Sequence, residues 1–169
     1  MSGMGDYMEM LEDLFDRWYV RPLKSLQQIP NGDGGFIALA ISCFLYERYA
    51  RAVITASGAQ ADKKAIIKQF SADFDVNEEV AGVFWDVIRN GLAHGAMPKQ
   101  QEHGQSALPK WAFRSDFPAV DLVEWEGERV LRVQPWLVMD KVISLWRQNL
   151  RLLGKSNGFP WATIVQLPF

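Results

Sequence analysis

The sequence holds one cysteine and two histidines, and these small numbers exclude several kinds of site. Cys43 cannot form an intramolecular disulfide, and it cannot build a zinc site with other cysteines, so a reducing compartment is expected. Cys43 also lies within an apolar stretch, which favours a buried structural thiol. His94 and His103 are far apart in the chain and have no carboxylate spacing typical of a metal centre. We therefore expect no metal and no cofactor, and we interpret His103, in the polar stretch KQQEHGQS, as a surface residue.

Long apolar runs are also missing. The longest, GGFIALAISCFLY, is shorter than the about 20 residues that span a bilayer, and it predicts a buried helix. The acidic N-terminus lacks the basic and apolar regions of a signal peptide. We therefore expect a cytoplasmic protein without membrane contact.

A strong excess of positive charge is absent as well. The net charge is −2, and it is uneven: residues 1–88 hold 8 Lys+Arg against 13 Asp+Glu, whereas residues 89–169 hold 10 against 7. So small an excess cannot by itself drive binding to nucleic acid. Any such binding has to come from a local arrangement of residues.

What the sequence does have is helical periodicity over a chain long enough for one domain with a real core. Pro22 is expected to end the first helix, Asn77 to cap the fourth, and Gly95 and Gly154 to stand just after the last two. The expected helices cover roughly residues 4–20, 35–57, 61–70, 78–94 and 136–153.

The periodicity changes before the last helix. The stretch DLVEWEGERVLRVQP predicts two short strands joined around Glu126 and Gly127, a β-hairpin inserted at about 118–134. The apolar tail, about 155–169, packs either on the body or on a partner. The expected fold is all-α: one domain over residues 1–169, an up-and-down bundle of four to five helices with a small inserted hairpin.

Two polar clusters interrupt the apolar helices. In YERYAR, at the end of the second helix, Glu47 and Arg51 are four residues apart and share a face, with Arg48 beside them. This pattern suits either a solvated helix end with a salt bridge or a polar cluster that faces a site on another helix.

The second cluster is RNGLAH, at the end of the fourth helix. Asn90 and His94 are one turn apart, and the long Arg89 side chain can swing toward them. Arginine binds phosphate oxygens in a bidentate manner, histidine transfers protons near neutral pH, and asparagine can orient either neighbour. Together they have the parts for cleavage of an RNA phosphodiester by its own 2′-hydroxyl, although a helix end with ordinary solvated cations is the alternative.

The motif RNGLAH resembles the signature of the HEPN superfamily, in which an arginine, commonly followed by a polar residue, precedes a histidine at the end of a bundle helix. The stretch from VIRNGLAHG through the hairpin and LRVQPWLVMDKV to the last helix also looks like a group of uncharacterised bacterial HEPN-like proteins. The resemblance covers most of residues 35–153. The resemblance implies a homodimer in which the motifs of two protomers face each other. Many members are metal-independent endoribonucleases of toxin–antitoxin, phage-defence or RNA-processing systems.

Carried onto this chain, the resemblance implies that Arg89 binds phosphate, His94 is the acid–base and Asn90 positions them, with Glu47 in support. Toxins paired with a nucleotidyltransferase antitoxin often carry a tyrosine two residues after the histidine. Here that position is Ala96, so control by modification of such a tyrosine is not expected.

Three functions remain open at this point, the third being a purely structural dimer subunit of a larger complex. The first is a metal-independent endoribonuclease that acts on RNA as a homodimer. The second is a non-catalytic HEPN-fold module that binds a partner protein such as an antitoxin, a nucleotide or RNA. An open cationic cleft at Arg89 and His94 would favour cleavage, whereas occlusion by Glu47 or by the tail would favour the binding module.

Overall fold

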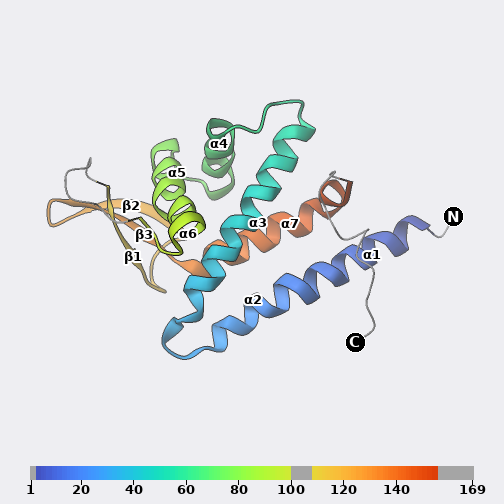
Figure 1. Cartoon of the computed structure of the whole chain (residues 1–169), viewed down its shortest axis with the longest axis horizontal. Coiled ribbons are helices and arrows are strands. Elements are labelled where there is room, and N and C mark those ends of the chain that lie inside the picture. Colours follow the sequence, from blue (N-terminus) through green and yellow to red (C-terminus); the bar gives the residue numbers. More distant parts are fainter. Residues whose placement is uncertain (1–2, 100–107, 156–169) are drawn as a thin grey trace.

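The computed structural model describes residues 3–99 and 108–155, which form a mostly helical protein with one small sheet (Figure 1). His103 and the apolar tail beyond residue 155 lie outside the described residues. Within these ranges, no helix has the length and apolar character of a membrane span. The helices are α1 (Gly3–Phe15), α2 (Arg21–Ser25), α3 (Gly34–Ala56), α4 (Lys63–Phe74), α5 (Glu78–Phe84), α6 (Asn90–Gly95) and α7 (Pro135–Lys155), and the strands are β1 (Lys110–Phe113), β2 (Val120–Trp125) and β3 (Glu128–Val133).

Pro22 does not end the first helix, contrary to the sequence-based expectation. A π-helical turn, Asp16–Val20, joins α1 directly to α2, in which Pro22 stands near the start. Within this turn the Arg21 N–H donates to the carbonyl of Asp16, five residues back. The wider turn changes the hydrogen-bond register just before the proline, and this lets the helical path continue through a residue without an N–H.

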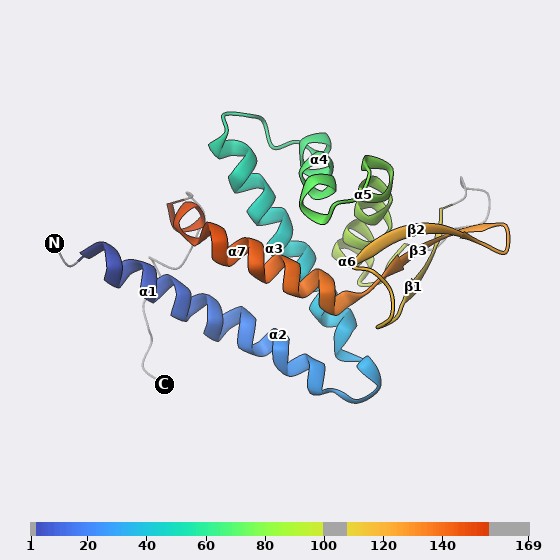
Figure 2. The ribbon, with the colours of Figure 1, turned by 180° about the vertical axis from the view of Figure 1, so that it is seen from behind.

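Helix α3 is the central helix, as its apolar sequence predicts, and it packs most extensively against α7. At one end Gly35 lies against Pro135 and Trp136; further along, the indole of Trp146 donates to the carbonyl of Leu45 at 2.8 Å. Both helices therefore run in the same direction, and they cross obliquely in both ribbon views (Figures 1 and 2).

The α1–α2 segment runs the opposite way along α7. Tyr7 donates to the carbonyl of Gly154 at 3.1 Å, while Asp16 pairs with Arg147 at 2.7 Å. The expected all-helical character is therefore confirmed in its coarse form, but the strictly up-and-down order is wrong. The sheet returns the chain to the start of α3 before α7 begins, so the two main neighbours lie parallel.

Gly154 is another correction, because it lies inside α7 rather than after it. A Cβ built on Gly154 would stand 2.5 Å from Cδ1 of Leu11. The residue therefore permits close contact between α7 and α1 and does not end the helix.

The inserted element is a three-stranded sheet rather than a hairpin, with the order β1-β3-β2. Strands β2 and β3 pair antiparallel around Glu126 and Gly127, as predicted, and both turn residues have positive φ, which fits a two-residue hairpin turn. Strand β1 then adds to β3 in parallel, with Lys110 opposite Val130. β1 is only four residues long and only partly buried, so it has little periodicity from which to predict it.

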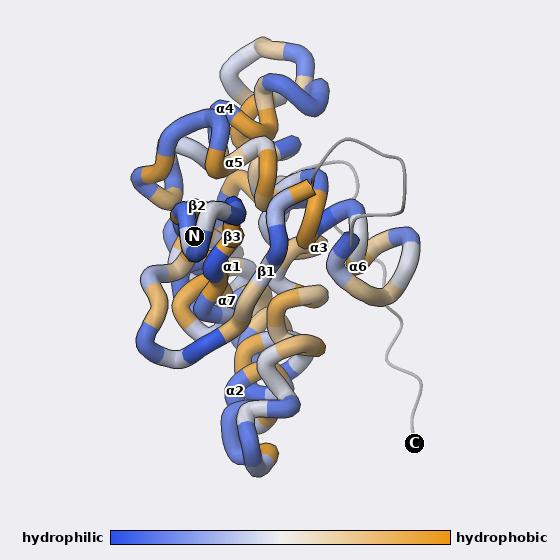
Figure 3. The backbone as a smooth tube through the Cα atoms, turned by 90° about the vertical axis from the view of Figure 1, so that its left-hand side faces the viewer, coloured by the Kyte–Doolittle hydropathy of each residue, from blue (hydrophilic) through white to orange (hydrophobic). Residues whose placement is uncertain are grey.

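One hydrophobic core joins the helices and the sheet. Apolar and polar residues alternate along the elements around it (Figure 3). Among its largest fully buried side chains are Trp146, Tyr46, Phe15, Phe70, Phe84, Leu11, Leu39, Ile66, Ile88, Leu131, Met139 and Leu150.

Candidate functional site

The helix that carries the RNGLAH motif is continuous from α5 through a π-helical turn, Trp85–Arg89, into α6. It begins as predicted at Asn77, whose side chain accepts a hydrogen bond from the Val80 N–H at 2.8 Å. In the π turn, Val87 and Ile88 are fully buried and anchor the helix in the core. Such turns are frequent at functional sites. Arg89 is the last residue of this turn, and Asn90 follows it directly.

The end of α6 folds back on the helix. The Lys99 N–H donates to the Val87 carbonyl at 2.8 Å, so the segment after α6 passes over Gly91. A Cβ on Gly91 would lie only 2.5 Å from the Lys99 nitrogen and 2.6 Å from the Met97 oxygen. The glycine in the motif is therefore required by a close backbone approach.

The residue that terminates α6 is Ala96, not Gly95. Ala96 adopts the left-handed conformation, with φ 54° and ψ 12°, while Gly95 is still helical. The predicted cap is therefore wrong by one residue, and the strained position is held by an alanine.

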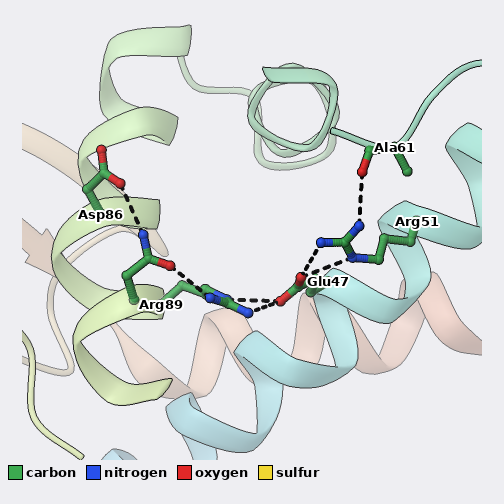
Figure 4. Close-up of polar contacts among 6 residues, drawn as sticks. Glu47, Arg51, Ala61, Asp86 and Arg89 are labelled. Atoms are coloured by element: carbon green, nitrogen blue, oxygen red, sulfur yellow. Dashed lines mark hydrogen bonds and ion pairs between the residues drawn. The ribbon is translucent and has the colours of Figure 1, made fainter. Parts of the chain in front are cut away.

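Arg89 reaches across from this helix to α3 and pairs with Glu47, forty-two residues earlier (Figure 4). Its Nε donates to Glu47 Oε2 at 2.9 Å, and its Nη2 donates to the same oxygen. The other carboxylate oxygen of Glu47 accepts from Arg51, whose Nη1 also donates to the carbonyl of Ala61 at 2.9 Å. The Arg89 and Glu47 side chains are only 19% and 16% exposed, so this ion pair is largely shielded from water.

The contacts continue on the other side of Arg89. Its Nη1 donates to Asn90 Oδ1 at 2.8 Å, and Asn90 Nδ2 donates to Asp86 Oδ1 at 3.1 Å. Asp86 also accepts from Lys63, at the start of α4, at 2.7 Å. Beneath the guanidinium lies the Trp85 ring, 5.4 Å from its Cζ, in a cation–π arrangement.

The structure thus joins most of the predicted site residues in one continuous chain of contacts, which we call the site network. Three cations alternate with two carboxylates along it, and the amide of Asn90 completes it. Both interpretations of YERYAR find a counterpart: Glu47 faces Arg89 on another helix, while its pair with the exposed Arg51, four residues later, is the expected salt bridge of a helix end. The members of the site network, in order, are Arg51, Glu47, Arg89, Asn90, Asp86 and Lys63.

His94 and Arg48, the other two predicted site residues, lie on the same helices as members of this network. His94 is exposed in the last turn of α6, and among the described residues its imidazole makes no hydrogen bond. Arg48 is half-buried and follows Glu47 in α3. The proximity of Arg89 and Asn90 is therefore confirmed by direct contact, whereas His94 shares only their helix.

Cys43 lies one turn before Glu47 and is buried, as predicted. Burial raises the pKa of its thiol to about 12, while the nearby Arg89 guanidinium acts in the opposite direction. A thiol with so high a pKa stays protonated and unreactive at neutral pH. Cys43 therefore serves as packing beneath the ion pair.

Three residues of the site, Trp85, Asp86 and Lys63, were not predicted from the sequence. For the first two a signal exists, because they precede Arg89 and Asn90 by four residues each and so lie one turn below them. Lys63 comes from another helix, and only the fold brings it near. Within the described part of the chain, no three His, Cys, Asp or Glu side chains are grouped as a metal site would need.

Comparisons of the chain with protein-family models, with curated proteins and with solved structures give no match. A functional interpretation therefore rests on the site network and on the motif RNGLAH.

Proposed function

We propose that this chain is a metal-independent endoribonuclease of HEPN type that acts in the cytoplasm as a homodimer. The observation that carries the proposal is the fixed position of Arg89 on the same short helix end as an exposed histidine. Glu47 and Asn90 hold the guanidinium from two sides, and His94 stands one turn beyond Asn90. Together they provide a fixed cation and an imidazole, the two kinds of group that the proposed cleavage of RNA uses.

In the proposed reaction the 2′-oxygen of a ribose attacks the adjacent phosphorus. His94 accepts the 2′-hydroxyl proton, the bond from phosphorus to the 5′-oxygen breaks, and that oxygen leaves with a proton from an imidazolium. The products are a 2′,3′-cyclic phosphate and a 5′-hydroxyl. A homodimer would supply both imidazoles, with one acting as base and the partner's as acid.

Arg89 keeps capacity for a phosphate despite its ion pair. A guanidinium has five N–H donors, and the described contacts of Arg89 use Nε, one bond from Nη1 and one from Nη2. Two N–H groups remain to bind the oxygens on which negative charge builds up. Arg51 and Lys63, whose side chains are 53% and 56% exposed, add positive charge on either side.

The second candidate is a non-catalytic binding module, and the Glu47–Arg89 pair is the observation that favours it. A carboxylate that already neutralises the guanidinium reduces its attraction for a phosphate, and occlusion of Arg89 by Glu47 is the arrangement expected of a binding module. Its ligand would be RNA, a nucleotide or a partner protein such as an antitoxin. A role as a toxin or phage-defence factor belongs to the first candidate.

Incubation of the purified protein with fluorescent single-stranded RNA in EDTA, analysed in parallel on denaturing and native gels, separates the two candidates. Shorter RNA on the denaturing gel supports the endoribonuclease. Intact RNA that is retarded on the native gel supports the binding module. Sedimentation at micromolar concentration tests the dimer, and a monomer would remove the shared site.

A further inference from the structure

The carboxylate of Asp86 lies below the motif and accepts two hydrogen bonds from different elements. Asn90, four residues later, donates from Nδ2 at 3.1 Å, and Lys63 from α4 donates from Nζ at 2.7 Å. Neither Asp86 nor Lys63 belongs to the motif RNGLAH or to the polar end of α3. The contacts nevertheless connect both residues to Arg89 through a single side chain, Asn90.

Donor and acceptor chemistry dictates which way the Asn90 amide faces. A guanidinium can only donate, so the amide oxygen has to face Arg89; an ionised carboxylate can only accept, so the amide nitrogen has to face Asp86. If the amide turned over, two donors would meet on one side and two acceptors on the other. Asp86 thereby selects the Asn90 orientation that holds Arg89 Nη1.

The spacing of the helix reinforces this role. Trp85 and Asp86 lie four residues before Arg89 and Asn90, so each of the two consecutive motif residues rests on its own support one turn below. The indole supports the guanidinium from its face, and the carboxylate supports the amide. Trp85 thus acts on Arg89 directly, whereas Asp86 acts on it through Asn90.

Lys63 gives the arrangement a second function. Asp86 is 43% exposed, and an uncompensated carboxylate there would repel a phosphate approaching Arg89. The ammonium of Lys63 balances that charge while leaving Asp86 able to accept from Asn90. The Asp86–Lys63 pair therefore supplies an acceptor for the Asn90 amide while causing little repulsion of an anionic ligand.

We propose that Asp86 is a positioning residue of the Arg89–His94 site, which orients Asn90 and through it Arg89, and that Lys63 neutralises its charge. As a role in catalysis this rests on the proposed endoribonuclease function. The arrangement of side chains that it requires, however, can be tested without any RNA.

The test compares Asp86→Ala and Asp86→Asn with Asp13→Ala. Asp13 is a matched control, because it is a helical aspartate that also accepts from the residue four positions later, Arg17, at 2.8 Å, but on α1. The first readout is the NMR spectrum of the Asn90 side-chain NH₂ and the Arg89 Nε–H groups, with urea unfolding to check that each variant is folded. The second readout is kcat and KM for cleavage of single-stranded RNA in EDTA.

We expect Asp86→Ala to shift and broaden both NMR signals and to lower kcat by roughly tenfold or more with less change in KM, as a misplaced catalytic group does. Asp86→Asn should keep most of the wild-type NMR signals and of the wild-type kcat, because its amide oxygen can still accept from Asn90. Asp13→Ala should change neither the NMR signals nor kcat. Unchanged Asn90 and Arg89 signals in folded Asp86→Ala would overturn the proposal. If the wild type cleaves no RNA, the endoribonuclease function fails, and the NMR comparison still decides the positioning role.

Discussion

The backbone N–H of Lys99 donates to the carbonyl of Val87, and this single bond folds the segment after α6 onto the helix that carries the motif. The two bonded residues are twelve positions apart, and the segment that ends at Lys99 passes over Gly91. There the backbone of this segment is too close to the helix backbone for a side chain on Gly91. This hydrogen bond holds the segment against the end of the motif helix. Gly91 is therefore a structural member of RNGLAH, whatever the other residues do.

Replacing Gly91 with alanine should destabilise the protein by about 1–3 kcal/mol, because the new methyl group would press on the Lys99 nitrogen and the Met97 oxygen. The control is Gly82→Ala in α5, where an added Cβ meets nothing within 4 Å. That change should stabilise the helix by about 0.5–1 kcal/mol. Urea unfolding of both variants measures the difference, and equal effects would contradict the close approach.

Glu47 should matter for stability more than an ordinary surface carboxylate. Glu47→Gln leaves two arginines without their anionic acceptor, and in this shielded position the free energy of unfolding should fall by about 1–3 kcal/mol. Glu128→Gln is the matched control, since Glu128 pairs with Lys110 on the surface and should change stability by less than about 0.5 kcal/mol. Similar values for the two variants in urea unfolding would show that the Glu47–Arg89 pair contributes little.

Alkaline pH should destabilise the protein through Cys43. Its thiol has a pKa of about 12 when folded, because it is buried, against 9.0 ordinarily. Between pH 9 and 10 the unfolded chain releases this proton while the folded protein retains it, so the free energy of unfolding falls by up to about 1.4 kcal/mol per pH unit.

The check is urea unfolding at pH 8 and pH 10 for the wild type and for Cys43→Ala. The wild type should lose about 1.4 kcal/mol more than the variant over this interval. Burial also raises the pKa values of Tyr46 and Tyr49, but from 10.0, so they act mainly above this window and equally in both proteins. An equal loss in the two proteins would mean that the thiol is accessible in the folded state.

His94 should be dispensable for folding. Its side chain is exposed, so His94→Ala should change the free energy of unfolding by less than about 0.5 kcal/mol. Ile88→Ala, six residues earlier and fully buried, should cost about 2–5 kcal/mol in the same measurement. A loss for His94→Ala approaching that of Ile88→Ala would identify a structural histidine and remove it as a candidate acid–base.

Local patterns sufficed to predict much of the helical part of the fold. The apolar stretch of α3, predicted over 35–57, forms a helix over Gly34–Ala56, and the Asn77 cap is confirmed by its hydrogen bond. Two of the errors fall where the backbone leaves standard geometry. A π turn carries the first helix through Pro22, and a left-handed alanine replaces the expected glycine cap.

Part of the site could likewise be predicted from the spacing of residues along one helix, whereas contacts between helices could not. Glu47 and Arg51 share a helix face by their spacing, but only the packing of α3 against the motif helix shows that Glu47 faces Arg89. Lys63 joins the network from a third element, so its contact with Asp86 depends on tertiary structure. Asp86 itself was within reach, because its spacing from Asn90 places the two on one face.

The most direct test of the proposed function is the chemistry of the RNA ends left by the protein in EDTA, compared with Arg89→Ala and His94→Ala. The proposal predicts fragments with 2′,3′-cyclic phosphate and 5′-hydroxyl ends from the wild type, and none from either variant. Fragments with other ends, or cleavage that persists in both variants, would contradict it.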